Sequence, residues 1–496
     1  MTRTPPLIVQ PNLSAPADAL ERASWRRVAL GMALALVGGA GLIASFPPIG
    51  AWPLILISFV PISVAQHRVL PARWAGLAPT IGIGSYITYL AWGGLTASQR
   101  WWLVLLIPVL VLTGQFDRRA QWATGLRHLW WSGPVLWTGA LFVVGLTPLA
   151  SWLDPAYALY RQPWLIQPVS VFALSGLNLV ILLTNYGIAA AVLSTGLRRR
   201  ALLVGGVAVL LTAWISTSAV LLSHSDSGRA LRVAVIQPGR NTHNPATPAA
   251  AQASNAAMLA VLERGTRRAA NDGAQLVVWP EKAFQDMGPG NTEWRNIERI
   301  AATAHVYLVV GYSPDPRRFN QAAVLDPSGR VLVTYNKQHP VSFAGDHSTG
   351  GPVVVASTPL GRIAPIICYD LDFENTARDA TRKGAQLLAV PSEDWAGIAD
   401  QHYTHLVFRA VENHVAAAKA DTAWDSAIID SHGRIHAAQV DTSSGSAVLV
   451  ATIPLGSGRS PFVTTGNWIG WTCVALSVVW LLIAAARMRS DVRTTG

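Results

Sequence analysis

Apolar residues along this chain gather in long runs, and the runs fall in two places. Residues 28–224 are dominated by apolar stretches close to the length that a helix needs to cross a lipid bilayer, about 20 residues. Residues 225–462 mix polar and apolar positions as a water-soluble domain does, and a last apolar run follows at 463–487. This pattern predicts a helical membrane bundle of about eight helices, with a soluble domain inserted before the last one.

Eight apolar runs are the candidate membrane spans. The fourth is short, and the sixth is long and contains Pro168. Tryptophans such as Trp25, Trp101 and Trp468 lie at the ends of runs, as aromatic residues do at the membrane–water interface. The predicted spans are 28–46, 52–70, 72–92, 101–116, 132–150, 166–195, 201–223 and 466–486.

The positions of the arginines predict the orientation, because cytoplasmic loops of membrane proteins are enriched in Lys and Arg. Fourteen arginines precede the first span, follow the second, fourth and sixth spans, or follow the last, whereas the other short loops hold only Arg100 and Arg161. We therefore expect the terminal segments, 1–27 and 488–496, to be cytoplasmic. The soluble domain would then lie on the extracytoplasmic (periplasmic) side of the inner membrane. The first span lacks a small-residue cleavage site, so it is interpreted as an anchor.

The soluble segment alternates short β-rich runs with helical stretches. Strands are predicted at Leu231–Gln237, Gln275–Trp279 and Ile363–Cys368, for example, and helices at about 250–271 and 401–414. Alternation of this kind predicts a layered α/β domain. No glycine-rich phosphate loop, paired-histidine metal motif or CxxC spacing is present in the sequence, which predicts neither a nucleotide cofactor nor a metal.

Composition narrows the class of protein further. Hydrophobic residues make up 51% of the chain and charged residues only 13%, as expected for an integral membrane protein. The net charge of +11 does not indicate nucleic-acid binding, because the arginines lie at the ends of apolar runs and no basic tract lies in the soluble segment. The two cysteines are Cys368 and Cys473, and Cys473 lies within the last span, so no structural disulfide is expected.

Three residues with catalytic potential each follow a predicted strand: Glu281, Lys337 and Cys368. Open α/β layers collect functional groups at strand ends, so the three could share one site. Each also has a structural interpretation that the residues alone leave open. A single cysteine is often a buried apolar residue, and a single lysine or glutamate at a strand end is usually solvated.

Several segments resemble motifs of the nitrilase (carbon–nitrogen hydrolase) superfamily. With seven predicted spans before this domain and one after it, the chain resembles the membrane-bound branch, the apolipoprotein N-acyltransferases. The resemblance implies a nitrilase-like layered α/β sandwich. The matching segments are Arg232-Val233-Ala234-Val235-Ile236-Gln237, Trp279-Pro280-Glu281, Asn336-Lys337-Gln338-His339, Cys368-Tyr369-Asp370, Pro391-Ser392-Glu393-Asp394-Trp395-Ala396-Gly397 (family pattern Asn-Asp-x-Trp-Phe-Gly) and Arg409-Ala410-Val411-Glu412-Asn413.

The resemblance also implies a reaction. Cys368 would be the nucleophile, Glu281 the general base and Lys337 the cation that stabilises the oxyanion. An acyl chain would pass from a membrane phospholipid, through a thioester on Cys368, to the N-terminal amine of a diacylglyceryl-cysteine lipoprotein. The supporting active-site residues implied are Asp346, Tyr369, Asp370 and Trp395.

The chain departs from the family pattern in several places. The loop after the lysine, normally Val-Pro-x-Gly-Glu, reads Val341-Ser342-Phe343-Ala344-Gly345-Asp346, so its acid is shorter and one position later. Lys282 follows Glu281 where a small hydroxyl residue is usual, and it is expected to pair with Glu281. Three alternatives therefore stay open. They are a membrane-tethered carbon–nitrogen hydrolase, a divergent paralogue that acylates another amine, and a binding protein whose catalytic residues are vestigial.

Overall fold

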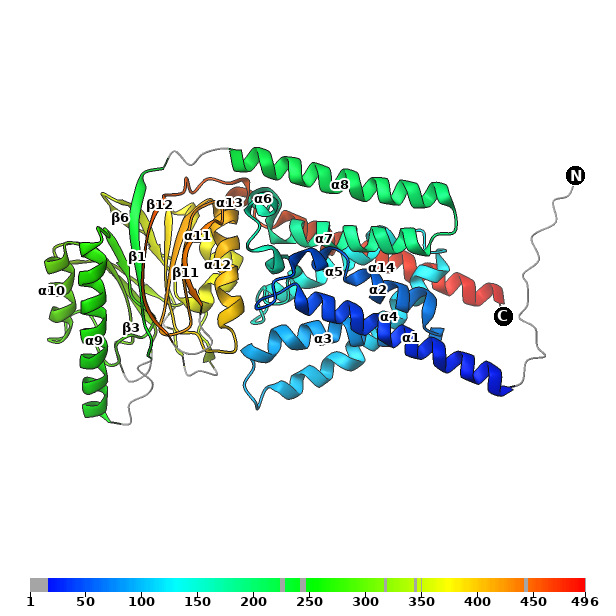
Figure 1. Ribbon diagram of the computed structural model, residues 1–496, viewed down its shortest axis with the longest axis horizontal. Coiled ribbons are helices and arrows are strands. Elements are labelled where there is room, and N and C mark those ends of the chain that lie inside the picture. Colours follow the sequence, from blue (N-terminus) through cyan, green and yellow to red (C-terminus); the bar gives the residue numbers. More distant parts are fainter. Residues whose placement is uncertain are drawn as a thin grey trace, which may run out of the picture.

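The computed structural model describes residues 17–223, 228–240, 247–315, 319–342, 346–348, 350–440 and 445–495. A helical bundle and an α/β domain lie side by side along the long axis of the molecule (Figure 1). Helix α1 (Ala17–Ala44) begins, and helix α14 (Trp468–Thr495) ends, at the end of the bundle that lies away from the α/β domain.

Within the described residues, five helical segments are long and apolar enough to cross a membrane. Helix α7 is the most enclosed of them, whereas α8 lies at the edge of the bundle with most of its side chains exposed. Helix α5 (Leu129–Gly145) is also apolar but has only 17 residues. The five segments are Trp25–Ala44 of α1, Arg100–Ala123 (η4, Arg100–Leu105, and α4, Leu106–Ala123), α7 (Val169–Leu193), α8 (Leu197–Ser223) and Trp468–Arg487 of α14.

The second and third predicted spans differ from the continuous helices expected from their apolar content. The second forms three short pieces, η1 (Trp52–Leu56), α2 (Phe59–Val64) and the π-helical η2 (Ala65–Val69). The third is η3 (Ala72–Trp74) followed by α3 (Leu77–Gly94). Prolines 53, 61 and 71 lie at or near these breaks, and proline removes a backbone donor and clashes with the preceding turn.

Pro168, expected inside the sixth span, instead immediately precedes α7, after the short η5 (Pro155–Leu159) and α6 (Pro163–Ile166). The number of times the chain crosses the membrane stays a prediction.

In the part of the α/β domain that the structure describes, the strands form two six-stranded sheets. In each sheet three strands run parallel, β1–β2–β3 in the first and β7–β8–β9 in the second, and the other pairs are antiparallel. The first sheet has the order β12 (Ser446–Pro454), β1 (Ala230–Pro238), β2 (Leu276–Val278), β3 (Tyr307–Tyr312), β4 (Gln321–Leu325), β5 (Val331–Asn336); the second has β11 (Ile435–Val440), β10 (Asp425–Ile429), β9 (Ala416–Asp421), β8 (Leu387–Ser392), β7 (Gly361–Pro365), β6 (Ala356–Thr358).

The two sheets pack face to face through small and β-branched side chains. Val235 and Val278 of the first sheet share a buried cluster with Leu387 and Ala418 of the second. Helices α9 (Pro248–Asn271) and α10 (Trp294–Ala304) cover the outer face of the first sheet, and α11 (Glu374–Arg382) and α12 (Ala399–Asn413) cover the second (Figure 1). This arrangement confirms the predicted α/β sandwich beside a helical bundle.

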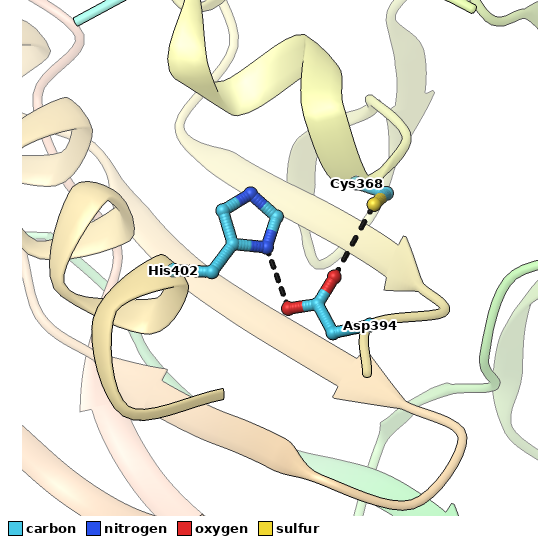
Figure 2. Close-up of side chains that lie close together, drawn as sticks. All are labelled: Cys368, Asp394 and His402. Atoms are coloured by element: carbon cyan, nitrogen blue, oxygen red, sulfur yellow. Dashed lines mark hydrogen bonds and ion pairs between the residues drawn. The ribbon is translucent and has the colours of Figure 1, made fainter. Parts of the chain in front are cut away.

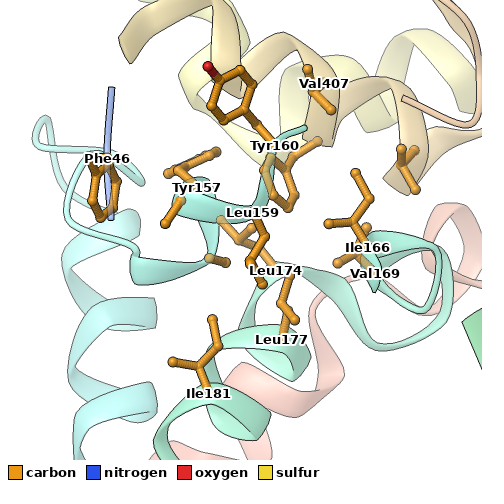
Figure 3. Close-up of a cluster of buried hydrophobic side chains, with 14 of the residues drawn as sticks. Phe46, Tyr157, Leu159, Tyr160, Ile166, Val169, Leu174, Leu177, Ile181 and Val407 are labelled. Carbon is orange, nitrogen blue, oxygen red and sulfur yellow. The ribbon is translucent and has the colours of Figure 1, made fainter. Parts of the chain in front are cut away.

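The α/β domain and the bundle share one continuous core. Tyr157, Ile166 and Leu174 of the bundle lie in the same buried cluster as Val407 of α12 (Figure 3). A polar bond reinforces it: the Glu412 carboxylate accepts a hydrogen bond of 3.1 Å from the backbone N–H of Leu174. That N–H lies next to Ala173, whose φ of 58° interrupts α7, so a side chain of the α/β domain satisfies a donor that the kink exposes.

Candidate active site

The three residues predicted to share a site do lie together. Glu281, Lys337 and Cys368 follow strands β2, β5 and β7, and all three side chains are buried. The Lys337 ammonium donates a 2.7 Å hydrogen bond to Glu281 Oε1. Both charges influence the pKa of the Cys368 thiol. The strands belong to two separate sheets, so their ends bring the thiol and the two charged groups together across the sandwich.

Cys368 stands at a sharp turn from strand to helix. It begins the short 3-10 helix η7 (Cys368–Asp372), and its φ of 44° places it in the left-handed region. That conformation is costly for a residue with a Cβ, about 1–3 kcal/mol, and tends to persist at functional sites. Asp370 helps to hold the turn, because its Oδ2 accepts a hydrogen bond of 3.1 Å from the Ile367 N–H.

The thiol of Cys368 is held in its neutral form. Burial raises its pKa well above the ordinary value, the carboxylates of Glu281 and Asp394 raise it further, and the Lys337 ammonium opposes them. A nucleophilic role therefore requires a proton acceptor nearby. Glu281 Oε1 is occupied by Lys337 and Asn320, whereas Glu281 Oε2 is buried and has no hydrogen-bond partner among the residues that the structure describes.

Lys337 stays charged despite complete burial. Burial alone would lower its pKa, but the carboxylates of Glu281 and Asp346 outweigh that effect and raise the pKa well above the ordinary value. Asp346 Oδ2 accepts from Lys337 Nζ at 2.7 Å. The acid of the altered loop therefore reaches the site, although residues 343–345 of that loop lie outside the described residues.

A second lysine contacts this group. Lys282 Nζ lies 2.7 Å from Asp346 Oδ1 and 3.0 Å from Glu393 Oε2. The expected partner, Glu281, also acts on Lys282 electrostatically and raises the pKa of this lysine. Burial by itself raises the pKa of Asp346, yet Lys337 and Lys282 prevail and hold it below its usual range.

Asp370 connects two of the catalytic candidates. Its carboxylate accepts hydrogen bonds from the Tyr335 hydroxyl at 2.7 Å and from the backbone N–H groups of Gln338 and His339 at 3.1 and 2.8 Å. These donors flank Lys337 in sequence, and Asp370 itself lies two residues after Cys368. The carboxylate thus fixes the lysine segment against the cysteine turn.

Tyr369 and Trp395, the other expected supporting residues, contact the bundle. The Tyr369 hydroxyl donates to the backbone carbonyl of Pro148, and Trp395 Nε1 donates to the carbonyl of Gly93 at 2.6 Å. Gly93 and Gly397 approach so closely that a Cβ added at Gly93 would meet the Gly397 carbonyl oxygen. The loops beside the thiol are therefore fastened to the bundle, at the end of α3 and in the segment just after α5.

A cavity of about 700 Å³ lies between the cysteine turn and the bundle. Tyr369 and Phe373 line it from the α/β domain, and Phe142, Leu146 and Trp471 line it from α5, the residues just after it, and α14. Polar side chains, including those of Arg378 and Asn467, line another part. The mixture of apolar and polar walls suits an amphiphilic molecule.

Sequence reasoning missed several residues around the thiol. Asn320 donates to both Glu281 and Asp346. On another side Asp394 Oδ1 accepts from Cys368 Sγ at 3.4 Å, and Asp394 Oδ2 lies 2.5 Å from His402 Nδ1 (Figure 2). Lys419 gave one usable signal, since it is the one basic residue in the alanine-rich strand Ala416–Asp421.

Cys368, Asp394 and His402 are residue types that bind metals, and their ligand atoms lie within 4.8 Å of one another. Lys419 Nζ, however, lies 2.8 Å from Asp394 Oδ2 and already supplies a positive charge there. The arrangement suits an internal ion-pair network better than a divalent cation, whose binding the ammonium would oppose. The absence of a metal stays a prediction.

Comparisons with known proteins cover both parts of the chain. A family model of carbon–nitrogen hydrolases matches residues 232–460, and a model of the apolipoprotein N-acyltransferase N-terminal domain matches residues 38–187. An apolipoprotein N-acyltransferase from Geobacter metallireducens is 28% identical, over 92% of this chain and 95% of the relative. One from Gloeobacter violaceus is 27% identical, over 93% and 95%.

Two further similarities cover only part of the chain. An omega-amidase from Xenopus tropicalis is 30% identical over 32% of this chain and 66% of its own length. Among solved structures, an amidase from a Nesterenkonia species is 24% identical and covers 46% of this chain and 92% of that chain, with a TM-score of 0.37.

Proposed function

This chain is similar to the apolipoprotein N-acyltransferase family over nearly its whole length, and we propose that it acylates lipoproteins. It is an N-acyltransferase with a nitrilase-superfamily domain in a multi-pass membrane protein. In the proposed reaction, an acyl chain leaves a membrane phospholipid, forms a thioester with Cys368, and is transferred to the N-terminal amine of a diacylglyceryl-cysteine lipoprotein.

The first half-reaction makes the thioester. Glu281 accepts the thiol proton, and the sulfur of Cys368 attacks the ester carbonyl carbon of the phospholipid. Lys337 stabilises the negative oxygen that forms on that carbon, an effect of about 3 kcal/mol for a well-placed donor. The C–O bond then breaks, and Glu281 returns its proton to the departing lysophospholipid oxygen.

The second half-reaction makes the amide. The acceptor nitrogen attacks the thioester carbon, the C–S bond breaks, and the thiolate recovers a proton. Glu281 is again the proton carrier, because its charge acts on the thiol and its Oε2 lacks a hydrogen-bond partner among the described residues.

One observation carries the proposal. A thiol, a carboxylate and an ammonium meet at the face of the α/β domain that lies on the lipid-embedded bundle, next to a cavity of about 700 Å³ with amphiphilic walls. Both proposed substrates are held in the membrane by their acyl chains. A hydrolase of small water-soluble amides would have no use for a site placed there.

The orientation is also a proposal. Helix α8 begins with Arg198, Arg199 and Arg200, and this end of the helix lies away from the α/β domain, as do the start of α1 and the end of α14 (Figure 1). This favours cytoplasmic termini and an extracytoplasmic α/β domain. A reporter that is active only outside the cytoplasm should work when fused after residue 460 and fail when fused after residue 200. The reverse result would contradict the orientation.

The reaction is tested in cells that contain this protein as their only candidate N-acyltransferase. Mass spectrometry of a model lipoprotein should show an amide-linked acyl chain on its N-terminal cysteine. A free N-terminus would refute the proposal. If another amine carries the chain instead, the protein is a divergent paralogue with a different acceptor.

A carbon–nitrogen hydrolase is the second candidate, favoured by the partial match to an omega-amidase. Purified protein without lipid should then release ammonia from simple amides. We expect no release above that of a Cys368→Ser variant.

A further inference from the structure

Cys368 has carboxylates on two sides, and the mechanism above uses only one. Glu281 is paired with Lys337 at 2.7 Å, and Asp394 is paired with Lys419 at 2.8 Å. The two carboxylate–lysine pairs come from different strands, and both carboxylates act on the thiol. Asp394 Oδ1 accepts a hydrogen bond of 3.4 Å from the sulfur (Figure 2).

Asp394 is held firmly in its ionised form. His402 Nδ1 and Lys419 Nζ both contact Oδ2, and the backbone N–H of Asp394 donates to Asp421 at 2.7 Å. Burial by itself raises the pKa of Asp394, but His402 and Lys419 outweigh it and hold the pKa well below the ordinary value. Asp394 is therefore a fixed negative charge and a poor base.

The two oxygens of Asp394 have separate tasks. Oδ2 faces the cations, whereas Oδ1 accepts from the Ser392 hydroxyl at 3.0 Å and from the Cys368 thiol. When the sulfur becomes a thioester it loses its hydrogen, so Oδ1 loses one of its two donors. An ionised, buried carboxylate then has an unfilled acceptor position next to the thioester sulfur, which is costly unless a new donor arrives.

We propose that Asp394 Oδ1 binds the ammonium group of the acyl acceptor in the acyl-enzyme and so holds its nitrogen beside the thioester carbon. This inference rests on the proposed N-acyltransferase function and adds the residue that recognises a primary ammonium. Because the free thiol occupies the same oxygen, the acceptor position opens only after the first half-reaction. That order suppresses unproductive binding of the acceptor to the unacylated enzyme.

The groups in the site account for each proton and each bond of the transfer to the amine. The bound ammonium gives one proton to Glu281 and becomes a neutral amine, which attacks the thioester carbon. As the C–N bond forms and the C–S bond breaks, Glu281 passes this proton to the departing thiolate and takes a second proton from the nitrogen. Glu281 releases its proton to water, so the products are the amide, the free thiol and one proton, and Asp394 stays ionised throughout.

The test uses the full-length protein with an Asp394→Asn variant. Asparagine can keep its oxygen toward His402 and Lys419 and place its amide nitrogen toward the sulfur, while Lys419 retains Asp425 at 2.5 Å. The thioester is first formed on phospholipid vesicles and measured by intact-protein mass spectrometry. It is then treated either with a lipopeptide that has a free N-terminal ammonium or with hydroxylamine, which is uncharged at neutral pH.

We expect the variant to form the thioester and to react with hydroxylamine as the wild type does. Its transfer to the lipopeptide should be slower by about tenfold to a hundredfold, the range for losing one charged hydrogen bond. Asp425→Asn is the matched control. It alters the same buried network without touching the sulfur, and it should leave the ratio of the two transfer rates unchanged.

Equal slowing with both nucleophiles, or no slowing with either, would overturn the inference. If Asp394→Asn does not fold, Asp394→Ser is tested in the same way, with thioester formation reporting the folded site. A wild-type protein that forms no thioester with phospholipid would refute the proposed function, and this inference with it. A wild type that transfers normally while the ratio is unchanged in the variant would refute this inference alone.

Discussion

Replacing Glu281 with glutamine should change the reactivity of the thiol and the rate of catalysis in opposite directions. The substitution keeps the shape of the side chain and an oxygen that can accept from Lys337 and Asn320. It removes one negative charge beside Cys368 and the proposed general base. Since the Glu281 charge raises the pKa of the thiol, the Glu281→Gln variant should have a lower Cys368 pKa than the wild type.

The size of the effect follows from the contacts. A charge within about 4–6 Å changes a pKa by about one to three. The Lys337 ammonium also lowers the thiol pKa, and in the variant it no longer has the Glu281 negative charge at 2.7 Å. Each lowering of the pKa by one raises the thiolate fraction about tenfold but weakens its nucleophilicity, with a Brønsted coefficient of about 0.4–0.5. The net gain in alkylation rate is therefore about threefold to sixtyfold.

The assay is alkylation by iodoacetamide, followed by mass spectrometry, in a Cys473→Ser background so that only Cys368 reacts. Because the reagent reaches the same buried sulfur in both proteins, access cancels in the ratio of rates. Acyl transfer by the same variant should fall by about a hundredfold to ten-thousandfold, the usual contribution of a general base.

A second variant tests the direction in which each charge changes the thiol pKa. Lys337→Met removes a charge that lowers the thiol pKa, so its alkylation should be slower than in the wild type. If Glu281→Gln reacts more slowly, or if both variants shift in the same direction, the electrostatic account of this site is wrong.

Three further predictions follow from other contacts. Cys368→Ser should abolish acyl transfer, because the weakly acidic hydroxyl is a poor nucleophile in this site, whereas Cys473→Ser in α14 should retain it; equal activity of the two variants would exclude a thioester. Asp346→Asn should flatten the acid limb of the stability profile in pH-dependent thermal melting. The folded-state pKa of Asp346 is depressed, so its contribution is present above the unfolded value of about 3.9 and is lost as the pH falls below it; an unchanged acid limb would contradict this. Gly93→Ala should reduce acyl transfer without removing the protein from the membrane, because the new Cβ would collide with the Gly397 carbonyl and displace the loop that carries Trp395; normal activity would show that this contact has no role.

Much of the architecture could be read from the order of residues. Apolar runs long enough for a bilayer predicted the bundle, and alternating strands and helices predicted the α/β domain, because both signals repeat locally along the chain. The strand-end positions of Glu281, Lys337 and Cys368 were visible in the same way. Whether each apolar run forms one continuous helix was harder to predict. The second predicted span is broken into short helices near its prolines, although its apolar content is that of a span.

What surrounds the thiol was decided by tertiary structure. The shorter acid Asp346 reaches Lys337 because the fold places these two side chains together, and no spacing rule states that distance. Asp394, His402 and Lys419 come from a strand end, a helix and another strand, so nothing in their separation along the chain marks them as partners. One sequence is enough to show the spacing of hydrophobic residues, because burial of one face imposes that spacing within each helix and each strand. The meeting of distant charges depends on how the sheets and helices pack, and that information lies in three dimensions.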